Sequence, residues 1–240
     1  MATTASNRRL PAVLWPLMFG NVVIGMGVMV VAGLLNDIRS ALDISISTAG
    51  QLISAAALLV SLGAPLLAML VACWDRRRLL VGSLLWFALF HTLAAWAPGF
   101  DSLLISRVLA MVSAAIFTPQ AAACIGLLVP AQLRGRGITF VFLGWSVASV
   151  LGTPLGAWIG GTFGWRWTMG LMAVLSLVAA LWLQLRMPKG IVPPPLSASA
   201  WRQTLLSSTL MLTLGITVLS AAGQFVLFSY MAPYVADRFG

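Results

Sequence analysis

Long apolar stretches without charged residues alternate along the chain with short breaks that hold nearly all of its charges. About 20 apolar residues in a row are enough for an α-helix to cross the hydrocarbon core of a bilayer. The pattern predicts seven such helices, at about 13–35, 47–72, 79–96, 103–128, 138–161, 168–185 and 205–230. The expected fold class is therefore an all-α polytopic membrane protein. The first stretch is uncharged from Leu10 to Asn36, too long for the apolar part of a signal peptide, so we interpret it as a membrane helix.

The composition agrees with a lipid environment. Charged residues make up 8% of the chain and hydrophobic residues 60%, whereas about a quarter of a soluble chain is charged. A water-soluble fold could not bury this much apolar surface. The net charge of +9 does not indicate nucleic-acid binding, because the basic residues lie in the breaks and not on a polar surface patch. Membrane lipid is the expected partner, and nucleic acid is not.

The basic residues also predict an orientation. With a cytoplasmic N-terminus, ten of them fall on the cytoplasmic side and three on the opposite side. The ten are Arg8, Arg9, Arg76, Arg77, Arg78, Arg134, Arg136, Arg186, Lys189 and Arg202, and the three are Arg39, Arg166 and Arg238. Cytoplasmic loops carry an excess of Lys and Arg, so we expect a cytoplasmic N-terminus.

One segment differs in composition from the rest. Residues 188–202 contain three consecutive prolines and several small polar residues, and consecutive prolines cannot continue a helix. We expect three parts: a six-helix bundle at 1–187, a cytoplasmic linker at 188–202, and the first helix of an incomplete C-terminal bundle at 203–240.

Small residues recur at every fourth position of the fifth predicted helix, and Pro154 lies among them. They are Gly144, Ala148, Gly152, Gly156, Gly160 and Gly164. This spacing places them along one side of a helix, where another backbone can approach closely, and the proline should kink the helix. The stripe is either a tightly packed interface or a hinge against which an opposite half would rock. Gly144, Gly152, Pro154 and Gly156 are the candidate hinge motif.

Two further groups of charged residues are candidate sites. Asp75 and Arg76 lie in the turn between helices 2 and 3, where the arginines anchor the topology. Asp75 either pairs with a neighbouring arginine or faces a helix N-terminus in one conformational state. Arg107 lies within helix 4, so it should face protein or a water-filled cavity unless it reaches the outer interface. Asp37, at the outer end of helix 1, is a plausible partner at similar depth. Protonation of Asp37 would then free Arg107, which makes this pair our proton-coupling candidate.

Polar and aromatic residues inside the helices are candidates for a substrate cavity. They are Asn21, Gln120, Gln224 and Phe228, and the amides would either bind substrate or tie helices together. His91, the one histidine, would either satisfy a neighbouring carbonyl or relay protons. The chain has no glutamate and no Gly-x-Ser-x-Gly element, which argues against an intramembrane enzyme. We expect no cofactor and no metal, and we interpret Cys73 and Cys124 as small buried thiols.

Three stretches resemble the major facilitator superfamily, in particular its drug:proton antiporters of the arabinose-efflux-permease type. They are Gly63-Ala64-Pro65 through Asp75-Arg76-Arg77-Arg78, Gly144 through Gly152-Thr153-Pro154-Leu155-Gly156 to Phe163-Gly164-Trp165-Arg166, and Phe228-Ser229-Tyr230-Met231-Ala232-Pro233-Tyr234. The sequence departs from the family pattern at Val71, Arg78 and Met111, where the family often has glycine.

The resemblance implies a bacterial inner (plasma) membrane exporter of a drug or sugar that exchanges it for protons by alternating access. It further implies that Asp75 and Arg76 act at a cytoplasmic gate. It also implies two six-helix halves, of which this chain supplies one half, a linker and one more helix. A second chain could supply the missing helices. The alternative is a truncated fragment or an assembly partner that does not transport.

Overall fold

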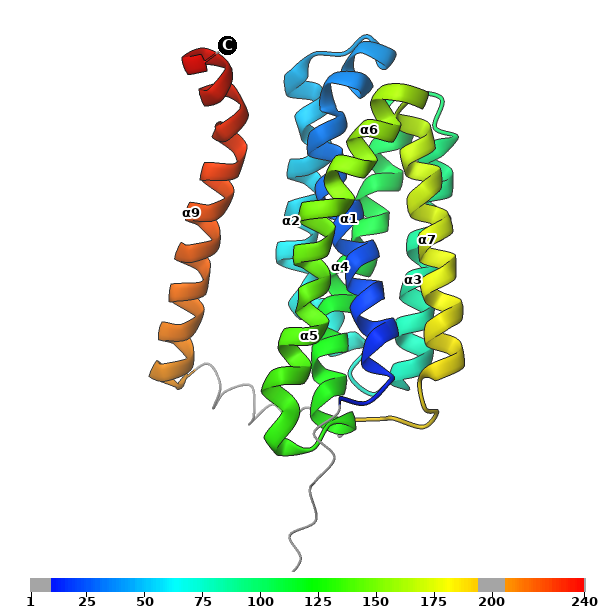
Figure 1. The fold of residues 1–240 in the computed structure, drawn as a ribbon, viewed down its shortest axis with the longest axis vertical. Helices are drawn as coiled ribbons and strands as arrows, with labels where there is room; N and C mark the ends of the chain where they lie inside the picture. The colour runs from blue at the N-terminus through cyan, green and yellow to red at the C-terminus, as the bar shows by residue number, and fades with distance from the viewer. Residues whose placement is uncertain (1–9, 194–205, 240) are drawn as a thin grey trace, which may run out of the picture. The chain divides into compact units, whose positions relative to one another are not determined.

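The computed structural model describes residues 10–193 and 206–239 of the chain (Figure 1). The chain divides into two compact units, Met1–Pro194 and Pro195–Gly240, which we describe separately. The boundary between them lies within the predicted linker. The second unit contains α9 (Ser208–Phe239), within which Ser208–Gln224 is an apolar stretch.

The first unit is a bundle of membrane-length helices, with chain directions that alternate from each helix to the next (Figure 1). Within the part of the chain that the structure describes, six helices are long and apolar enough to cross a membrane. Five are α1 (Leu14–Leu42), α2 (Ile46–Leu70), α3 (Arg76–Ala95), α4 (Phe100–Leu128) and α7 (Trp165–Arg186). The remaining span, Ala131–Phe163, is built from η1 (Ala131–Leu133), α5 (Arg134–Val147), η2 (Ala148–Gly152) and α6 (Thr153–Phe163).

Several observed helices extend beyond the apolar stretches that predicted them, although α2 ends at Leu70, two residues before the predicted end. Helix α1 continues through Asp37 to Leu42, and α3 already begins at Arg76. Hydropathy detects only the part of a helix that crosses hydrocarbon, whereas backbone hydrogen bonding continues into the polar interface. Local signals set the true ends. The side chain of Ser45 caps α2 by accepting from the backbone N–H of Thr48 at 3.0 Å.

Helix α1 packs against α4, α5, α6 and α7, so it lies at the centre of the bundle. Helix α3 packs mainly against α7 and α4. The largest fully buried side chains of this core include Leu17, Ile24, Phe87 and Phe117. Helix α2 differs, because its buried residues are only Ala49, Leu52 and Ala56.

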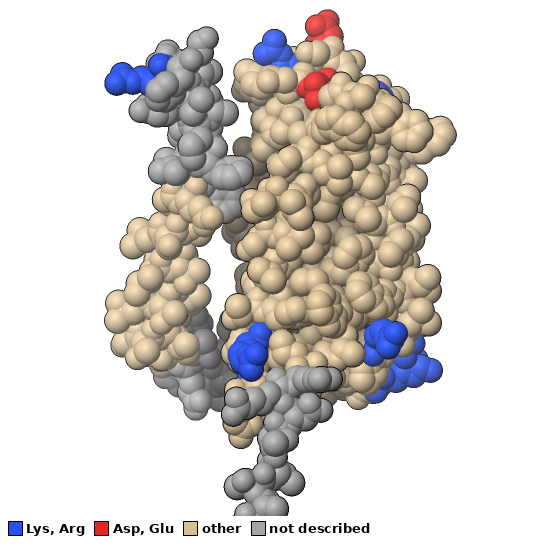
Figure 2. All heavy atoms as spheres, in the orientation of Figure 1, with Lys and Arg blue, Asp and Glu red and all other residues tan. Residues whose placement is uncertain are grey.

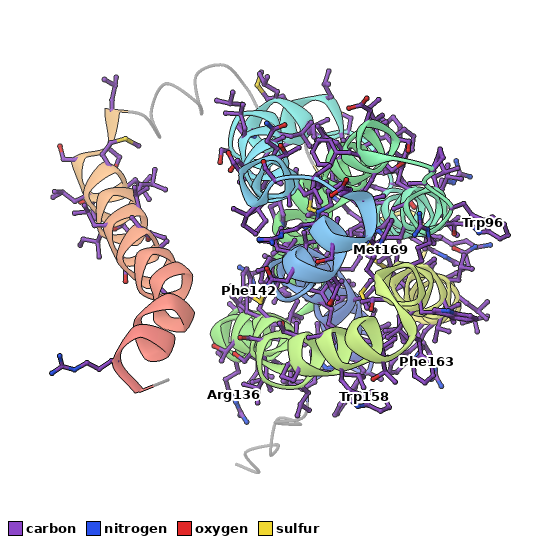
Figure 3. The ribbon with its side chains drawn as sticks, turned by 90° about the horizontal axis from the view of Figure 1, so that it is seen from above. Trp96, Arg136, Phe142, Trp158, Phe163 and Met169 are labelled. Carbon is purple, nitrogen blue, oxygen red and sulfur yellow. The ribbon has the colours of Figure 1, made fainter. Side chains whose placement is uncertain are left out.

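Charged side chains gather at the two ends of the bundle, and the band between them is uncharged on the visible face (Figure 2). Large aromatic side chains point outward around the bundle, among them Trp96, Trp158 and Phe163, while Met169 is buried between the helices (Figure 3). An uncharged band with polar ends and outward aromatic residues is typical of a protein that has lipid as its solvent.

Candidate functional site

Arg107 is a charged side chain in the interior of the bundle. It lies on α4, only 4% of its surface is exposed, and its guanidinium donates hydrogen bonds to two backbone carbonyls of α1. One is the carbonyl of Gly27, and the other is that of Val28, at 3.0 Å. A helical carbonyl oxygen keeps a second lone pair that can accept from a side chain. Arg107 therefore faces protein, and the alternative that it reaches the outer interface is wrong.

The structure does not bring Arg107 and Asp37 together. Asp37 lies on α1, ten residues beyond Gly27, which is about 15 Å along a helix that rises 1.5 Å per residue. The predicted ion pair is therefore not formed in this structure. The physical reason is that Arg107 finds acceptors at its own depth in the bundle, whereas the partly buried Asp37 lies near the outer end of α1.

His91 on α3 lies close to Arg107 and is 1% exposed. Its Nδ1 is 2.9 Å from the carbonyl oxygen of Phe87, and its ring lies 4.1 Å from the ring of Phe87. A carbonyl oxygen only accepts, so Nδ1 carries the proton and Nε2 keeps a lone pair in the neutral ring. His91 thus satisfies a neighbouring carbonyl, as one of the two interpretations predicted.

Asn21 joins three helices. Its side-chain amide on α1 donates to the carbonyl of Val141 on α5 at 3.2 Å and accepts from the hydroxyl of Thr118 on α4 at 2.8 Å. Asn21 is completely buried, so these bonds tie the helices together and leave the amide no free surface.

The other cavity candidates lie in both units of the chain. Gln120 is buried on α4, and Gln224 is exposed on α9 in the second unit. The helix α9 also contains Phe228, whose side chain lies outside the described part of the structure.

The turn before α3 holds the beginning of the linker. Asp75 caps α3 by accepting from the backbone N–H of Arg78 at 3.0 Å, and its second oxygen accepts from the N–H of Gly190 at 2.7 Å. The backbone N–H of Arg76 donates to the carbonyl of Ile191 at 2.9 Å. Sequence reasoning singled out Asp75 and Arg76 but missed Gly190. The sequence did offer one indication of a turn, since Gly190 follows two residues after Pro188. In the structure Gly190 has a positive φ of 76°, a conformation that glycine adopts readily.

The environment of Asp75 favours its charged form. Burial by itself raises the pKa of the carboxyl, but the hydrogen bonds from the N–H groups of Arg78 and Gly190 and the positive charge of Arg78 outweigh this effect. The net result is a pKa below the ordinary aspartate value. The carboxylate is therefore ionised at neutral pH and holds both of its backbone donors.

The glycine stripe of the fifth span faces α1 of the same bundle. A side-chain carbon at Gly144 would meet the carbonyl oxygen of Met18 and the side chain of Asn21. One at Gly152 would meet Met26, and one at Gly156 would meet Val30. The expectation that these glycines face an opposite half is thus wrong here, because α1 already occupies that side.

The same span contains a local change of helix type. Residues Ala148–Gly152 form a π-helical turn, in which the N–H of Thr153 bonds to the carbonyl of Ala148. Pro154 follows directly and cannot donate a backbone hydrogen bond. The axis changes direction between α5 and α6 (Figure 1), as expected at a proline and a π-turn.

This bundle, with its apolar belt and its buried arginine held by backbone carbonyls, defines a polytopic α-helical membrane protein. The Major Facilitator Superfamily family model matches residues 17–240. The chain belongs to the Major Facilitator Superfamily, a family of transporters and not of enzymes.

Three relatives illustrate the match. The chloramphenicol resistance protein of Streptomyces lividans is 35% identical over 237 residues, which cover 96% of this chain and 60% of that protein. The inner membrane transport protein YdhP of Escherichia coli K12 is 31% identical, covering 84% and 52%. A probable sugar efflux transporter of Mannheimia succiniciproducens is 32% identical, covering 84% and 51%. The chain thus spans about half to three fifths of the length of these curated relatives.

Solved structures agree on the fold. A bacterial homologue of the human lysosomal transporter Spinster, in an inward-facing and occupied conformation, superposes with a TM-score of 0.71 at 21% identity. The match covers 93% of this chain and 53% of that chain. The fold is therefore that of a six-helix bundle of the superfamily with one further helix.

Proposed function

We propose that this chain is the N-terminal part of a proton-coupled exporter of a small organic solute, a drug or a sugar, which works by alternating access. Export is proposed because relatives carry the names chloramphenicol resistance protein and probable sugar efflux transporter. The proposed location is a bacterial inner membrane with a cytoplasmic N-terminus, since one relative is named an inner membrane transport protein. A second chain is the proposed source of the helices that complete the transporter.

The main support for this proposal is the burial of the Arg107 side chain inside the bundle. A charge inside a membrane bundle is costly, and such residues generally mark ion or substrate pathways. The guanidinium is held by carbonyls and not by a carboxylate, so its positive charge is uncompensated by its hydrogen-bond partners. The electrostatic energy of such a charge changes strongly when a group nearby takes up a proton. Asp37 is the proposed proton-exchanging carboxylate, which would approach Arg107 in a different conformation of the cycle.

The moving parts are proposed at the π-turn and at the turn before α3. The π-turn next to Pro154 supports a hinge in the fifth span, with Gly144, Gly152 and Gly156 as its sliding contacts on α1. Asp75 and Arg76 are proposed as the cytoplasmic gate. Gln120 is the remaining substrate-contact candidate in the first unit, and Gln224 and Phe228 are proposed to contribute from α9.

Proton-gradient-driven flux in proteoliposomes tests the proposal, with chloramphenicol and arabinose as probes. The 240-residue chain is compared with a version extended to twelve helices, and each is tested with Arg107→Ala. We expect flux that Arg107→Ala abolishes without loss of membrane insertion. Arg39→Ala is the matched control, because Arg39 is an exposed arginine on α1.

The outcomes separate the alternatives. Flux only in the extended form would make this chain one part of the transporter, and flux in both forms would mean that the short chain assembles into a working oligomer. Unchanged flux in Arg107→Ala would contradict the coupling role. No flux of any probe in either form would favour the alternative of a fragment or assembly partner that does not transport.

A further inference from the structure

The fifth span accepts hydrogen bonds from side chains of other helices at two of its backbone carbonyls. Asn21 on α1 donates to the carbonyl of Val141 on α5 at 3.2 Å, and Thr168 on α7 donates to the carbonyl of Gly156 on α6 at 2.9 Å. Both donors are completely buried, and Asn21 is itself held by the hydroxyl of Thr118 on α4. A side chain that bonds to a main-chain carbonyl of a neighbouring helix ties down the backbone itself. Each bond therefore fixes the part of the span to which it is made.

The two bonds lie on opposite sides of the π-turn. Val141 comes seven residues before Ala148, where the π-turn begins, and Gly156 comes four residues after Gly152, where it ends. Among the described residues, the side-chain hydrogen bond to the π-turn comes from Thr153 of the same span. The segment α5 is thus tied to α1 and the segment α6 to α7, and the turn where the axis changes direction is tied to neither helix by such a bond (Figure 1).

The π-turn instead makes apolar contacts, and two of them are with methionines. Ala148 forms a small buried cluster with Met26 of α1 and Met172 of α7, and a side-chain carbon at Gly152 would lie against Met26. Methionine is unbranched and has three rotatable side-chain bonds, so it adapts to irregular gaps better than branched residues do. The contacts at the π-turn can therefore follow a change in its bend, whereas a hydrogen bond weakens steeply when its geometry is lost.

We propose that the fifth span moves as two segments that pivot about the π-turn. Asn21 fixes α5, Thr168 fixes α6, and Met26 and Met172 keep the joint filled as the angle changes. Asn21 and Thr168 are then positioning residues, because they are completely buried and act through the backbone of the span. The use of this pivot in transport rests on the proposed function, whereas the two-segment motion itself does not.

Distances between spin labels, measured by double electron–electron resonance on the full chain in lipid nanodiscs, test this motion. Phe142 on α5 and Trp158 on α6 are exposed label positions, and Leu89 on α3 is an exposed reference position (Figure 3). Each is replaced by cysteine in a background with Cys73→Ser and Cys124→Ala, which removes the native thiols. The pair 142 and 89 gives the α5–α3 distance, and the pair 158 and 89 gives the α6–α3 distance.

Thr168→Val removes the hydroxyl and keeps the shape of the side chain. It should broaden the distribution of the α6–α3 distance and leave the α5–α3 distance unchanged. A hydrogen bond between membrane helices shifts an equilibrium about threefold on average, so the population outside the main distance should rise by roughly this factor. Thr168→Ser keeps the hydroxyl and should restore the narrow distribution. Ser176→Ala is the matched control, because Ser176 is equally buried on α7 but bonds to a carbonyl of its own helix.

Asn21→Leu releases the other segment. It replaces the amide by an apolar side chain of similar size, so it should broaden the α5–α3 distance and leave the α6–α3 distance unchanged. A change of both distances in either variant would mean that the span moves as one rod, and no change in either variant would mean that the bonds do not fix it. Each of these results overturns the proposal. If Asn21→Leu does not fold, the Thr168 variants decide the question by the same comparison of the two distances.

The methionine contact is tested with Met172→Ile. Isoleucine is also apolar, but its branched Cβ makes the side chain stiff, so both distance distributions should become narrower. Met169→Ile is the matched control, because Met169 is also buried on α7 but belongs to a different core cluster. Unchanged distributions in Met172→Ile, or equal narrowing in both variants, would refute the adaptable joint.

Transport provides a second readout, in whichever form of the protein carries flux. Thr168→Val should lower the maximal flux with little change in the half-saturating substrate concentration, because it alters a motion and not substrate binding. Thr168→Ser should restore most of the flux. Equal flux in Thr168→Val and the unaltered chain would refute the use of the pivot in transport. If no form transports, the proposed function fails, and the spin-label distances still decide the two-segment motion.

Discussion

Backbone carbonyls accept the hydrogen bonds of the buried polar side chains in this bundle. Arg107 donates to Gly27 and Val28, His91 to Phe87, and Asn21 to Val141. Every helical residue offers such a carbonyl, and so the sequence contains no mark of which one will be used. This is why burial of Arg107 was predictable from its apolar surroundings, whereas its partners were not. Asp37, the carboxylate that the sequence suggested as a partner, lies near the outer end of α1 and away from Arg107.

At Asp75, one substitution separates two functions of the same carboxylate. Asp75→Asn should keep the cap of α3, because asparagine is an equally good cap residue, but its NH₂ group cannot accept from the N–H of Gly190. We expect amide exchange at Gly190 to rise about fivefold, which corresponds to roughly 1 kcal/mol for the lost bond. Hydrogen exchange followed by mass spectrometry measures this. Asp75→Ala is the comparison, and it should additionally destabilise the first turn of α3.

Acid should release the same contact in the unaltered chain. The folded-state pKa of Asp75 is lowered, so its contribution is complete above the ordinary aspartate pKa of about 3.9 and is lost as the pH falls through the lower, folded-state value. Exchange at Gly190, corrected for the intrinsic pH dependence of amide exchange, should therefore rise only below about pH 4. Release already between pH 5 and 7 would mean that another group holds this segment.

On the scale of elements, the close contact between α1 and α5 depends on the absence of a side chain at Gly144. Gly144→Ala would place a methyl group against the carbonyl oxygen of Met18, which belongs to the backbone and cannot move aside easily. We expect a loss of stability of about 1–3 kcal/mol from this overpacking. Thermal unfolding in mild detergent is the measurement.

The control lies on the same span. Gly161→Ala meets open space on α6, so the better helix propensity of alanine should leave stability equal or raise it by about 0.5–1 kcal/mol. Equal unfolding temperatures for Gly144→Ala and Gly161→Ala would contradict a tight approach of α1 and α5 at Gly144.

The sequence predicted where the six helices of the bundle lie, because lipid demands long apolar stretches and the chain has them. It also predicted a close-packed side in the fifth span from its glycines. The direction of that side was not predictable, since glycine at 144 or 156 shows only that something approaches closely and does not identify which helix does so. The contact between Asp75 and Gly190 joins residues 115 positions apart, and no local pattern connects them.

On the scale of the whole molecule, the uneven distribution of charge predicts an orientation that a native cysteine can report. Cys73 is exposed and lies beside the basic residues 76–78, whereas Cys124 is buried, so the expectation of a buried thiol is wrong for Cys73. If the basic end is cytoplasmic, a membrane-impermeant maleimide should label Cys73 in inverted vesicles and not in intact cells.

A matched variant tests the accessibility of the opposite end of the bundle. In a Cys73→Ser background, Ser47→Cys places a thiol at an exposed position near the start of α2, at the other end of the bundle. It should be labelled in intact cells. If the two labelling patterns are exchanged, the orientation is reversed and the proposed cytoplasmic gate faces the outside.

The π-turn of the fifth span has a geometric consequence for the four-residue glycine repeat. An α-helix turns about 100° per residue, so every step of four residues overshoots a full turn by about 40°. From Gly144 to Gly160 the overshoot would reach about 160°, and Gly160 would point away from α1. The π-turn at 148–152 takes up one extra residue, about 100° of this rotation. The single relaxation of the winding, at the middle of the span, thus helps a strictly four-residue repeat to stay in contact with one partner helix from Gly144 to Gly160.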